Sequence, residues 1–174
     1  MKEIENIELT LLTMADYDEL KTVMIESYVT MPDAFWREHQ IRTLIEKFPE
    51  GQVIIKINNR IAGCALAIII DYDSFEQQHT YRDITGRYTF DTHTDLGDVM
   101  YGIDVFIKPA YRGLRLGRRL YDYRKELCEK LNLKGIAFGG RIPNYHKYAD
   151  TITPKEYIEK VKRKEIHDPV LNFQ

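Results

Sequence analysis

The sequence contains few of the features that mark secreted or membrane-spanning proteins. Its 174 residues include only two cysteines, Cys64 and Cys128, which lie in apolar or helical patterns and are expected to be buried, reduced thiols. The longest apolar run, residues 61–70, is too short to cross a bilayer. The first six residues include no apolar stretch typical of a secretion signal. We therefore expect a cytoplasmic protein without membrane association.

The chain also lacks an excess of charge of either sign. Its 25 basic and 27 acidic residues give a net charge of −2, which does not favour a nucleic-acid-binding protein. Disorder is excluded because 44% of the residues are hydrophobic and twelve are tyrosines. A chain of this length suits one globular domain, which we place over residues 1–174.

Hydrophobic periodicity predicts the element order β-α-α-β-β-β-α-β-α. Strands are expected around residues 4–11, 53–57, 60–70, 101–107 and 135–139, and helices over residues 17–27, 33–48 and 115–131 and after residue 153. Asp16 and Glu19 are expected to cap the first of these helices. Thr153 and Glu156 form the same kind of capping box at the last helix.

Two connections in this order are also interpretable. Asn58-Asn59 suits a tight hairpin turn because asparagine tolerates a positive φ, and Pro32-Asp33 is expected to open the second helix. The polar segment 71–98 is long for a structureless loop. It is either a functional cover or contains a short helix near residues 74–82.

The segment from residue 103 to residue 125 carries the chemical signal. A strand ends at Pro109, the chain turns through Gly113, and a helix begins near Gly117. The first N–H groups of a helix lack internal partners and lie where the helix dipole attracts anions. From Lys108 to Lys125, seven basic residues accompany one acid, Asp122: Lys108, Arg112, Arg115, Arg118, Arg119, Arg124 and Lys125. The pattern suits an anion with several phosphates, although a solvated basic helix face would have the same composition.

Residues 107–117, IKPAYRGLRLG, resemble motif A of the GNAT-type N-acetyltransferases, as does the element order from residue 5 to about 165. The resemblance implies an α/β fold with a mixed, splayed central sheet flanked by helices, and acetyl-coenzyme A (acetyl-CoA) as co-substrate. Arg115 stands where the signature has its middle glycine, so its side chain must point away from the diphosphate or contact a phosphate. The coenzyme-binding positions implied by the resemblance are Val105, Phe106, Ile107, Arg112, Gly113, Leu114, Arg115, Leu116, Gly117, Arg118 and Asn144.

Residues 139–148 and the tail 156–174 resemble a GNAT domain that precedes a carbon–nitrogen hydrolase (nitrilase-like) domain in bacterial two-domain proteins. By this resemblance the chain is truncated at its C-terminus, lacks the last two strands of the family, and is covalently linked to a hydrolase in the full-length protein. The sheet edge thereby exposed would be covered by the missing segment or by a second copy in a homodimer.

The resemblance also implies catalytic roles. Tyr148 is the proposed acid that protonates the leaving thiolate, with Tyr145 as its substitute. Tyr101 occupies the position where relatives often have a glutamate base, and water is the alternative proton acceptor. Strand alternation predicts that Asp104 faces away from Tyr101, which favours a structural role for it. Asp98 is the other nearby carboxylate.

We expect no metal site. Asp91, His93 and Asp95 alternate along an extended segment, but polar residues in a polar loop are usually solvated. Two functions remain open. The first is an acetyl-CoA-dependent N-acetyltransferase that acts on a small-molecule or peptide amine. The second is a non-catalytic coenzyme A (CoA)-binding or docking domain that serves the attached hydrolase.

Overall fold

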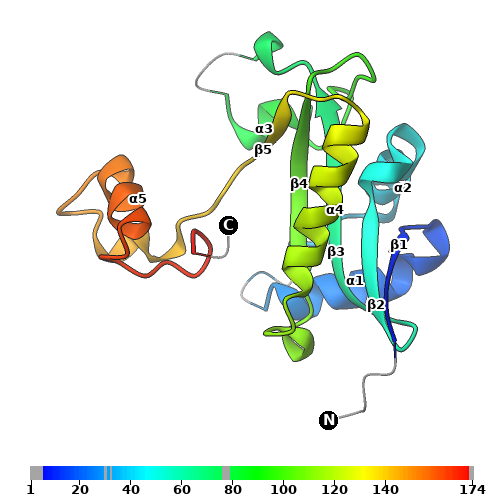
Figure 1. Ribbon diagram of the computed structural model, residues 1–174, viewed down its shortest axis with the longest axis horizontal. Helices are drawn as coiled ribbons and strands as arrows, with labels where there is room; N and C mark the ends of the chain where they lie inside the picture. The colour runs from blue at the N-terminus through cyan, green and yellow to red at the C-terminus, as the bar shows by residue number, and fades with distance from the viewer. Residues whose placement is uncertain (1–5, 30, 32, 76–78, 173–174) are drawn as a thin grey trace. The chain divides into compact units, whose positions relative to one another are not determined.

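The computed structural model describes residues 6–29, 31, 33–75 and 79–172. The chain divides into two compact units, residues 1–138 and 139–174, which are described separately. The first unit contains a five-stranded sheet in chain order: β1 (Ile7–Leu11), β2 (Val53–Ile57), β3 (Arg60–Ile70), β4 (Val99–Ile107) and β5 (Gly135–Phe138) (Figure 1). Strands β1 to β4 pair antiparallel, and β5 pairs parallel to β4. This mixed sheet with flanking helices confirms the predicted fold class.

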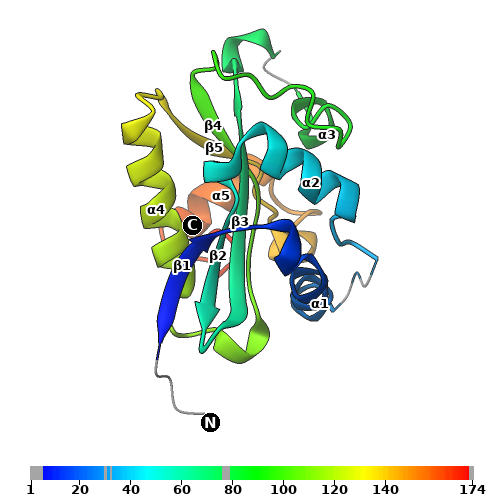
Figure 2. The ribbon, with the colours of Figure 1, turned by 90° about the vertical axis from the view of Figure 1, so that its right-hand side faces the viewer.

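Helices cover both faces of the sheet (Figure 2). One face packs against α1 (Tyr17–Ser27), α2 (Glu38–Lys47) and the single turn α3 (Tyr81–Ile84), and the other against α4 (Leu116–Lys130). Strand β3 is buried from its second residue onward because it is the central strand and both of its faces are covered. The predicted hairpin between β2 and β3 is confirmed, with positive φ angles of 49° at Asn58 and 62° at Asn59.

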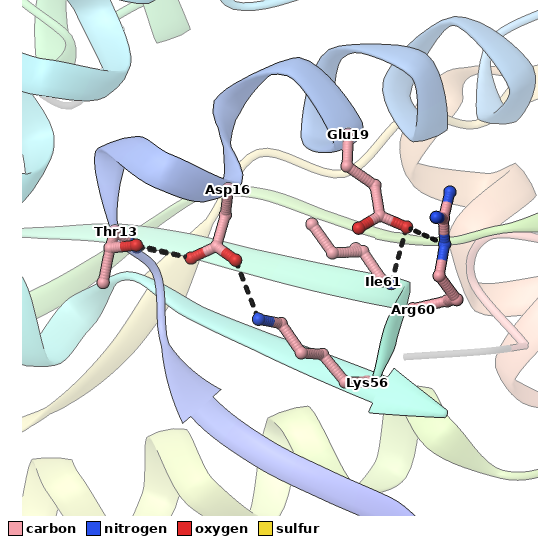
Figure 3. A network of polar contacts seen from close by, with 6 residues as sticks. All are labelled: Thr13, Asp16, Glu19, Lys56, Arg60 and Ile61. Carbon is pink, nitrogen blue, oxygen red and sulfur yellow. Dashed lines mark hydrogen bonds and ion pairs between the residues drawn. The ribbon is translucent and has the colours of Figure 1, made fainter. Parts of the chain in front are cut away.

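Asp16 occupies the predicted N-cap position of the first helix, but the expected side-chain capping bonds are absent (Figure 3). Asp16 makes no side-chain capping bond to α1. It closes the preceding 3₁₀ turn by accepting the backbone N–H of Thr13 at 3.0 Å, and it binds Lys56 Nζ at 2.8 Å. Glu19 pairs with Arg60 Nε at 2.7 Å and accepts the N–H of the next residue of β3. Both carboxylates are therefore used to hold α1 against the β2–β3 hairpin.

The second helix begins later than predicted. Pro32 lies outside the described residues, Asp33 lies in a turn, and α2 starts only at Glu38. The reason is that Arg37 donates its N–H to Gln40 Oε1 at 2.9 Å, which starts the helix there. Within the polar segment 71–98, α3 is the short helix that was one of the two expectations, and it overlaps the predicted range.

The second unit contains α5 (Pro154–Lys162), which opens with the predicted Thr153–Glu156 capping box. Asp168 is fully buried in this unit and accepts the Tyr157 hydroxyl at 2.7 Å. Burial, aided by this carboxylate, raises the pKa of Tyr157 to about 12. That residues 1–174 form one domain remains a prediction.

Candidate active site

The turn between β4 and α4 is held in an unusual backbone conformation. After β4, the Lys108 N–H donates to the carbonyl of Ala62 at 2.8 Å and fixes the start of the turn. Gly113 and Arg115 then adopt positive φ angles of 86° and 57°. A Cβ atom added at Gly113 would meet no atom within 4 Å, so the backbone at this point borders open space.

This conformation leaves a row of backbone donors without acceptors. Arg115 is the residue that precedes α4, and its side chain makes no capping bond. Across residues 113–118, all of which the structure describes, no N–H group donates to a backbone or side-chain acceptor of the chain. The dipole of the 15-residue helix α4 adds positive potential at this point. Residues 113–118 therefore have the physical features of an anion receptor, and we call them the anion-binding turn after this predicted role, which remains a prediction.

Arg124 does not belong to this basic surface. Arg124 is only 3% exposed, and its Nη2 atom donates to the carbonyls of Leu66 at 2.6 Å and Asp104 at 2.8 Å. It lies four residues after Leu120 and three before Leu127, on the buried stripe of α4. Counting it with the exposed basic residues was wrong, because helical spacing directs it into the sheet.

Three other basic side chains near the turn are also engaged, including Arg118, whose Nε atom lies 4.0 Å from Asp122 Oδ2. Lys108 Nζ pairs with Glu26 at 3.0 Å. The Arg112 guanidinium donates to the carbonyls of Ile107 at 3.3 Å and Ser27 at 3.4 Å. The positive charge available for an anion is consequently smaller than the seven basic residues suggest, and the backbone amides carry more of the site.

Beside the turn, the edge of β4 that faces β5 is open within the described part of the first unit, in that no strand pairs with it there. Its parallel pairing with β5 covers only Val99 to Gly102, whereas β4 continues to Ile107. Val105, Phe106 and Ile107 therefore pair with β3 on one edge and have no partner in β5 on the other. This divergence is the expected splay of the sheet, and it places the three predicted pantetheine-binding residues on a backbone edge next to the anion-binding turn.

Strand β4 contains a β-bulge at the point where the two strands separate. Leu66 pairs with Asp104 and Ala67 pairs with Gly102, so Ile103 is an extra residue in β4. An inserted residue shifts the alternation of all side chains that follow it.

The bulge corrects the predicted orientation of Asp104. Tyr101 and Ile103 both pack in the core on the α1–α2 face, and the Asp104 carboxylate points to the same face. There its Oδ1 atom accepts the Tyr28 hydroxyl at 2.5 Å and its Oδ2 atom accepts Trp36 Nε1 at 3.1 Å. Asp104 and Tyr101 thus share a face of the sheet, contrary to simple alternation.

Asp104 is the functional candidate that sequence reasoning set aside. Burial raises its pKa, although the hydrogen bonds from Tyr28 and Trp36 oppose the shift. The two donors come from the end of α1 and from the connection that leads into α2, about 70 residues away along the chain. No local sequence pattern links them, so only the folded structure reveals the cluster.

The candidate proton carriers lie in different units. Tyr101 is 4% exposed in β4, where its ring lies 6.3 Å from that of Tyr81. Tyr148 is half-buried in the second unit, where its ring lies 5.6 Å from that of Tyr157, and Tyr145 donates to a carbonyl of the same unit. Their catalytic roles remain predictions.

Asn144 makes its described contacts within the second unit. Its Nδ2 atom donates to the His167 carbonyl at 3.1 Å, and its N–H donates to Asp168 at 3.2 Å. These bonds connect the segment after β5 to the end of the chain. The predicted contact between Asn144 and the coenzyme remains a prediction.

The loop that contains His93 is organised by hydrogen bonds. His93 Nδ1 accepts the N–H of Ile69 at 3.0 Å, and Nε2 contacts Asp95 Oδ1 at 3.2 Å. Burial lowers the pKa of His93 despite this carboxylate. Among the described residues, no cluster of three or more His, Cys, Asp or Glu side chains is arranged to hold a metal ion. Within the same residues, no helix has the length and apolar character needed to cross a membrane.

Comparison with known proteins identifies the family. The sequence model of the acetyltransferase (GNAT) family matches residues 17–148, which include β4, the anion-binding turn and α4. The chain belongs to the GNAT acetyltransferase family. The matched residues include both the splayed part of the sheet and the uncapped start of α4.

Two relatives from Bacillus subtilis (strain 168) show the extent of the similarity. The chain is 45% identical over 139 residues to "Probable hydrolase YhcX", covering 80% of this chain and 27% of that protein. It is 35% identical over 141 residues to "Uncharacterized N-acetyltransferase YkwB", covering 81% of this chain and 62% of that protein. The chain thus spans about a quarter and about three fifths of the lengths of these two relatives.

Solved structures share the fold of this GNAT chain at low sequence identity. The loading GNATL domain of CurA from Lyngbya majuscula aligns with a TM-score of 0.80 and 22% identity, covering 97% of this chain and 82% of the other. The GphF GNAT-like decarboxylase in complex with isobutyryl-CoA aligns with a TM-score of 0.71 and 16% identity, covering 95% and 82%. At these identities the likeness establishes the fold alone.

Proposed function

We propose that this GNAT protein is an acetyl-CoA-dependent N-acetyltransferase that transfers the acetyl group directly to an amine of a small molecule or peptide. The observation that carries the proposal is the row of unpartnered N–H groups over residues 113–118, next to the open edge of β4. A diphosphate fits such donors, and the open space at Gly113 lets it approach the backbone. The fold that this chain shares with a protein bound to isobutyryl-CoA supports an acyl-CoA ligand.

Each part of the site has a distinct task in this proposal. The N–H groups of residues 113–118 hold the diphosphate, and the backbone of Val105, Phe106 and Ile107 pairs with the pantetheine arm. Bound acetyl-CoA supplies an activated thioester. An N–H group of β4 stabilises the oxyanion that develops when the neutral amine attacks the thioester carbonyl. Tyr148 remains the proposed proton donor to the thiolate, with Tyr145 as its substitute.

Calorimetry and turnover test this function in sequence. We expect acetyl-CoA and CoA to bind, and thioester cleavage to accelerate with at least one member of a panel of primary amines. Binding without turnover on any amine would support the non-catalytic docking domain instead. Absence of binding at millimolar ligand would contradict both functions.

Charge reversal at the two ends of α4 tests whether the coenzyme binds at the start of this helix. We expect Arg118→Glu to weaken coenzyme binding about ten- to hundredfold, the magnitude of a lost charge-assisted hydrogen bond. Lys130→Glu is the matched control, because it makes the same charge change at the exposed C-terminal end of the same helix. Equal affinities for the two variants would exclude the turn as the diphosphate site.

Two proposals concern the whole protein. A carbon–nitrogen hydrolase domain on the same polypeptide is supported by the 45% identity to a protein named a probable hydrolase. A homodimer would cover the outer edge of β5, which has no further strand beside it among the described residues. The mass of the native polypeptide tests the first proposal, and its mass in solution tests the second.

A further inference from the structure

The bulge in β4 is held by side chains from several elements of the first unit. The Ile103 carbonyl, which belongs to the extra residue, accepts the hydroxyl of Tyr81 from α3 at 2.7 Å. The Asp104 carbonyl accepts Arg124 from α4 on the opposite face at 2.8 Å. Both carboxylate oxygens of Asp104 accept donors, Tyr28 and Trp36, from the α1–α2 region. The position and direction of the Asp104 carboxylate are therefore fixed before any ligand binds.

Asp104 occupies the place where an acyl group would arrive. The last pair between β4 and β5 is Gly102 with Phe138, and Asp104 follows two residues later, where the strands separate. Asp104 lies three residue steps, about 10 Å at 3.3 Å per residue, from Ile107 at the end of β4 next to the anion-binding turn. A ligand arm extended along this edge from the turn would run toward Asp104.

We infer that Tyr28 and Asp104 form the proton acceptor of the acetyl transfer, with Tyr28 contacting the amine and Asp104 acting through Tyr28. This inference rests on the proposed N-acetyltransferase function and assigns a base to it. Tyr28 is half-buried, and its hydroxyl lies 2.5 Å from Asp104 Oδ1. The arrangement provides a carboxylate base at the site although Tyr101 stands where relatives often have a glutamate.

The proton transfer balances within the dyad. The amine nitrogen forms its bond to the thioester carbonyl carbon, and the bond from that carbon to sulfur breaks with its electron pair on the sulfur. The amine proton passes to Tyr28 Oη while the hydroxyl proton of Tyr28 passes to Asp104 Oδ1. The dyad returns to its initial state when Asp104 gives a proton back to the Tyr28 oxygen and Tyr28 releases one to water, while the thiolate takes its proton from the proposed donor Tyr148.

The surroundings of Asp104 favour reversible protonation. The titratable and charged groups that face it are Tyr28 at the end of α1, Cys64 of β3 and Arg124 of α4. The Arg124 guanidinium is held at the backbone of Asp104, so it moderates the effect of burial without forming an ion pair with the carboxylate. Burial raises the pKa of Asp104 above the ordinary aspartate value, which makes the carboxylate a stronger proton acceptor.

Three substitutions in the full chain test the dyad with acetyl-CoA and the best amine of the panel. Tyr28→Phe keeps the aromatic ring, which packs edge-on against Phe106 at 6.0 Å, and removes only the hydroxyl. We expect kcat to fall at least a hundredfold, the lower range of a lost general base, with an unchanged KM for acetyl-CoA. Asp104→Asn should lower kcat similarly and abolish the acidic limb of the kcat/KM–pH profile.

Trp36→Phe distinguishes a catalytic role of Asp104 from a structural one, because it removes the other hydrogen bond to the same carboxylate and leaves the Tyr28 hydroxyl in place. We expect less than a tenfold loss of kcat and a retained acidic limb. Tyr123→Phe, which removes a phenol bond to the Glu50 carbonyl on the other face, should behave as wild type. Equal losses in Tyr28→Phe and Trp36→Phe with an unchanged pH profile would show that Asp104 only ties the α1–α2 region to β4.

The failure of the inference differs from the failure of the proposed function. Wild-type protein that turns over no amine contradicts the N-acetyltransferase function, and the dyad with it. Wild-type turnover that persists at full rate in Tyr28→Phe and Asp104→Asn contradicts the dyad alone.

Discussion

The left-handed conformation of Arg115 leads to a quantitative prediction about the anion-binding turn. A residue with a side chain at φ 57° costs about 1–2 kcal/mol relative to glycine, because its Cβ approaches the backbone. Arg115→Gly relieves this strain. It also adds freedom to the unfolded chain, which costs about 0.4–1 kcal/mol. We expect a net gain of about 0.8 kcal/mol in the free energy of unfolding.

Arg115→Ala is the matched control. The side chain of Arg115 is exposed and makes no capping bond, so its removal alone should change stability by less than about 0.5 kcal/mol. The alanine variant keeps the strain, because alanine also carries a Cβ. Both variants lose the same charge, so their affinities for CoA should agree.

Urea denaturation at pH 7 measures the difference in free energy of unfolding between Arg115→Gly and Arg115→Ala. Thermal unfolding should show the same difference as a Tm about 2–3 °C higher for the glycine variant. Arg115→Gly that is no more stable than Arg115→Ala would refute the assigned backbone strain. It would mean that the turn relaxes without cost, and that the uncapped amides are not held in place by this residue.

Three further predictions concern other parts of the chain. Gly113→Ala should destabilise the protein by about 0.8 kcal/mol in urea, because about 1–2 kcal/mol of backbone strain is partly offset by about 0.4–1 kcal/mol from the reduced freedom of the unfolded chain, and the added Cβ meets no atom within 4 Å. Burial lowers the pKa of His93, so its contribution to stability is complete above the unfolded value of 6.5 and is lost as the pH falls below it. Between pH 7.5 and pH 5, the free energy of unfolding should therefore decrease less for His93→Gln than for wild type. Tyr157→Phe removes a hydroxyl bound to buried Asp168 and should weaken the second unit by about 1.5–3 kcal/mol, measured as faster amide exchange in residues 139–172, whereas Tyr148→Phe should have little effect.

Local patterns predicted most elements because each follows from interactions between residues close in sequence. The period of the apolar residues placed α1, α4 and the buried strand β3. The Asn58-Asn59 pair placed the hairpin, since both residues adopt the positive φ that the turn requires. The start of α2 and the partners of Asp16 and Glu19 were less predictable, since these two carboxylates bind Lys56 and Arg60 of a distant hairpin rather than the backbone of α1.

The sequence by itself determined the position of the anion-binding turn, because Gly113, Gly117 and the start of α4 lie close together in the chain. Only the tertiary structure decided the role of Asp104. The bulge arises in the pairing of β4 with β3, and it turns Asp104 to the face where Tyr28 and Trp36 can reach it. Likewise, helical spacing puts Arg124 on the buried face of α4, but the carbonyls of Leu66 and Asp104 that accept its guanidinium are brought there by the sheet. Contacts between residues so far apart in sequence form only when the sheet and its helices pack together, so no local pattern records them.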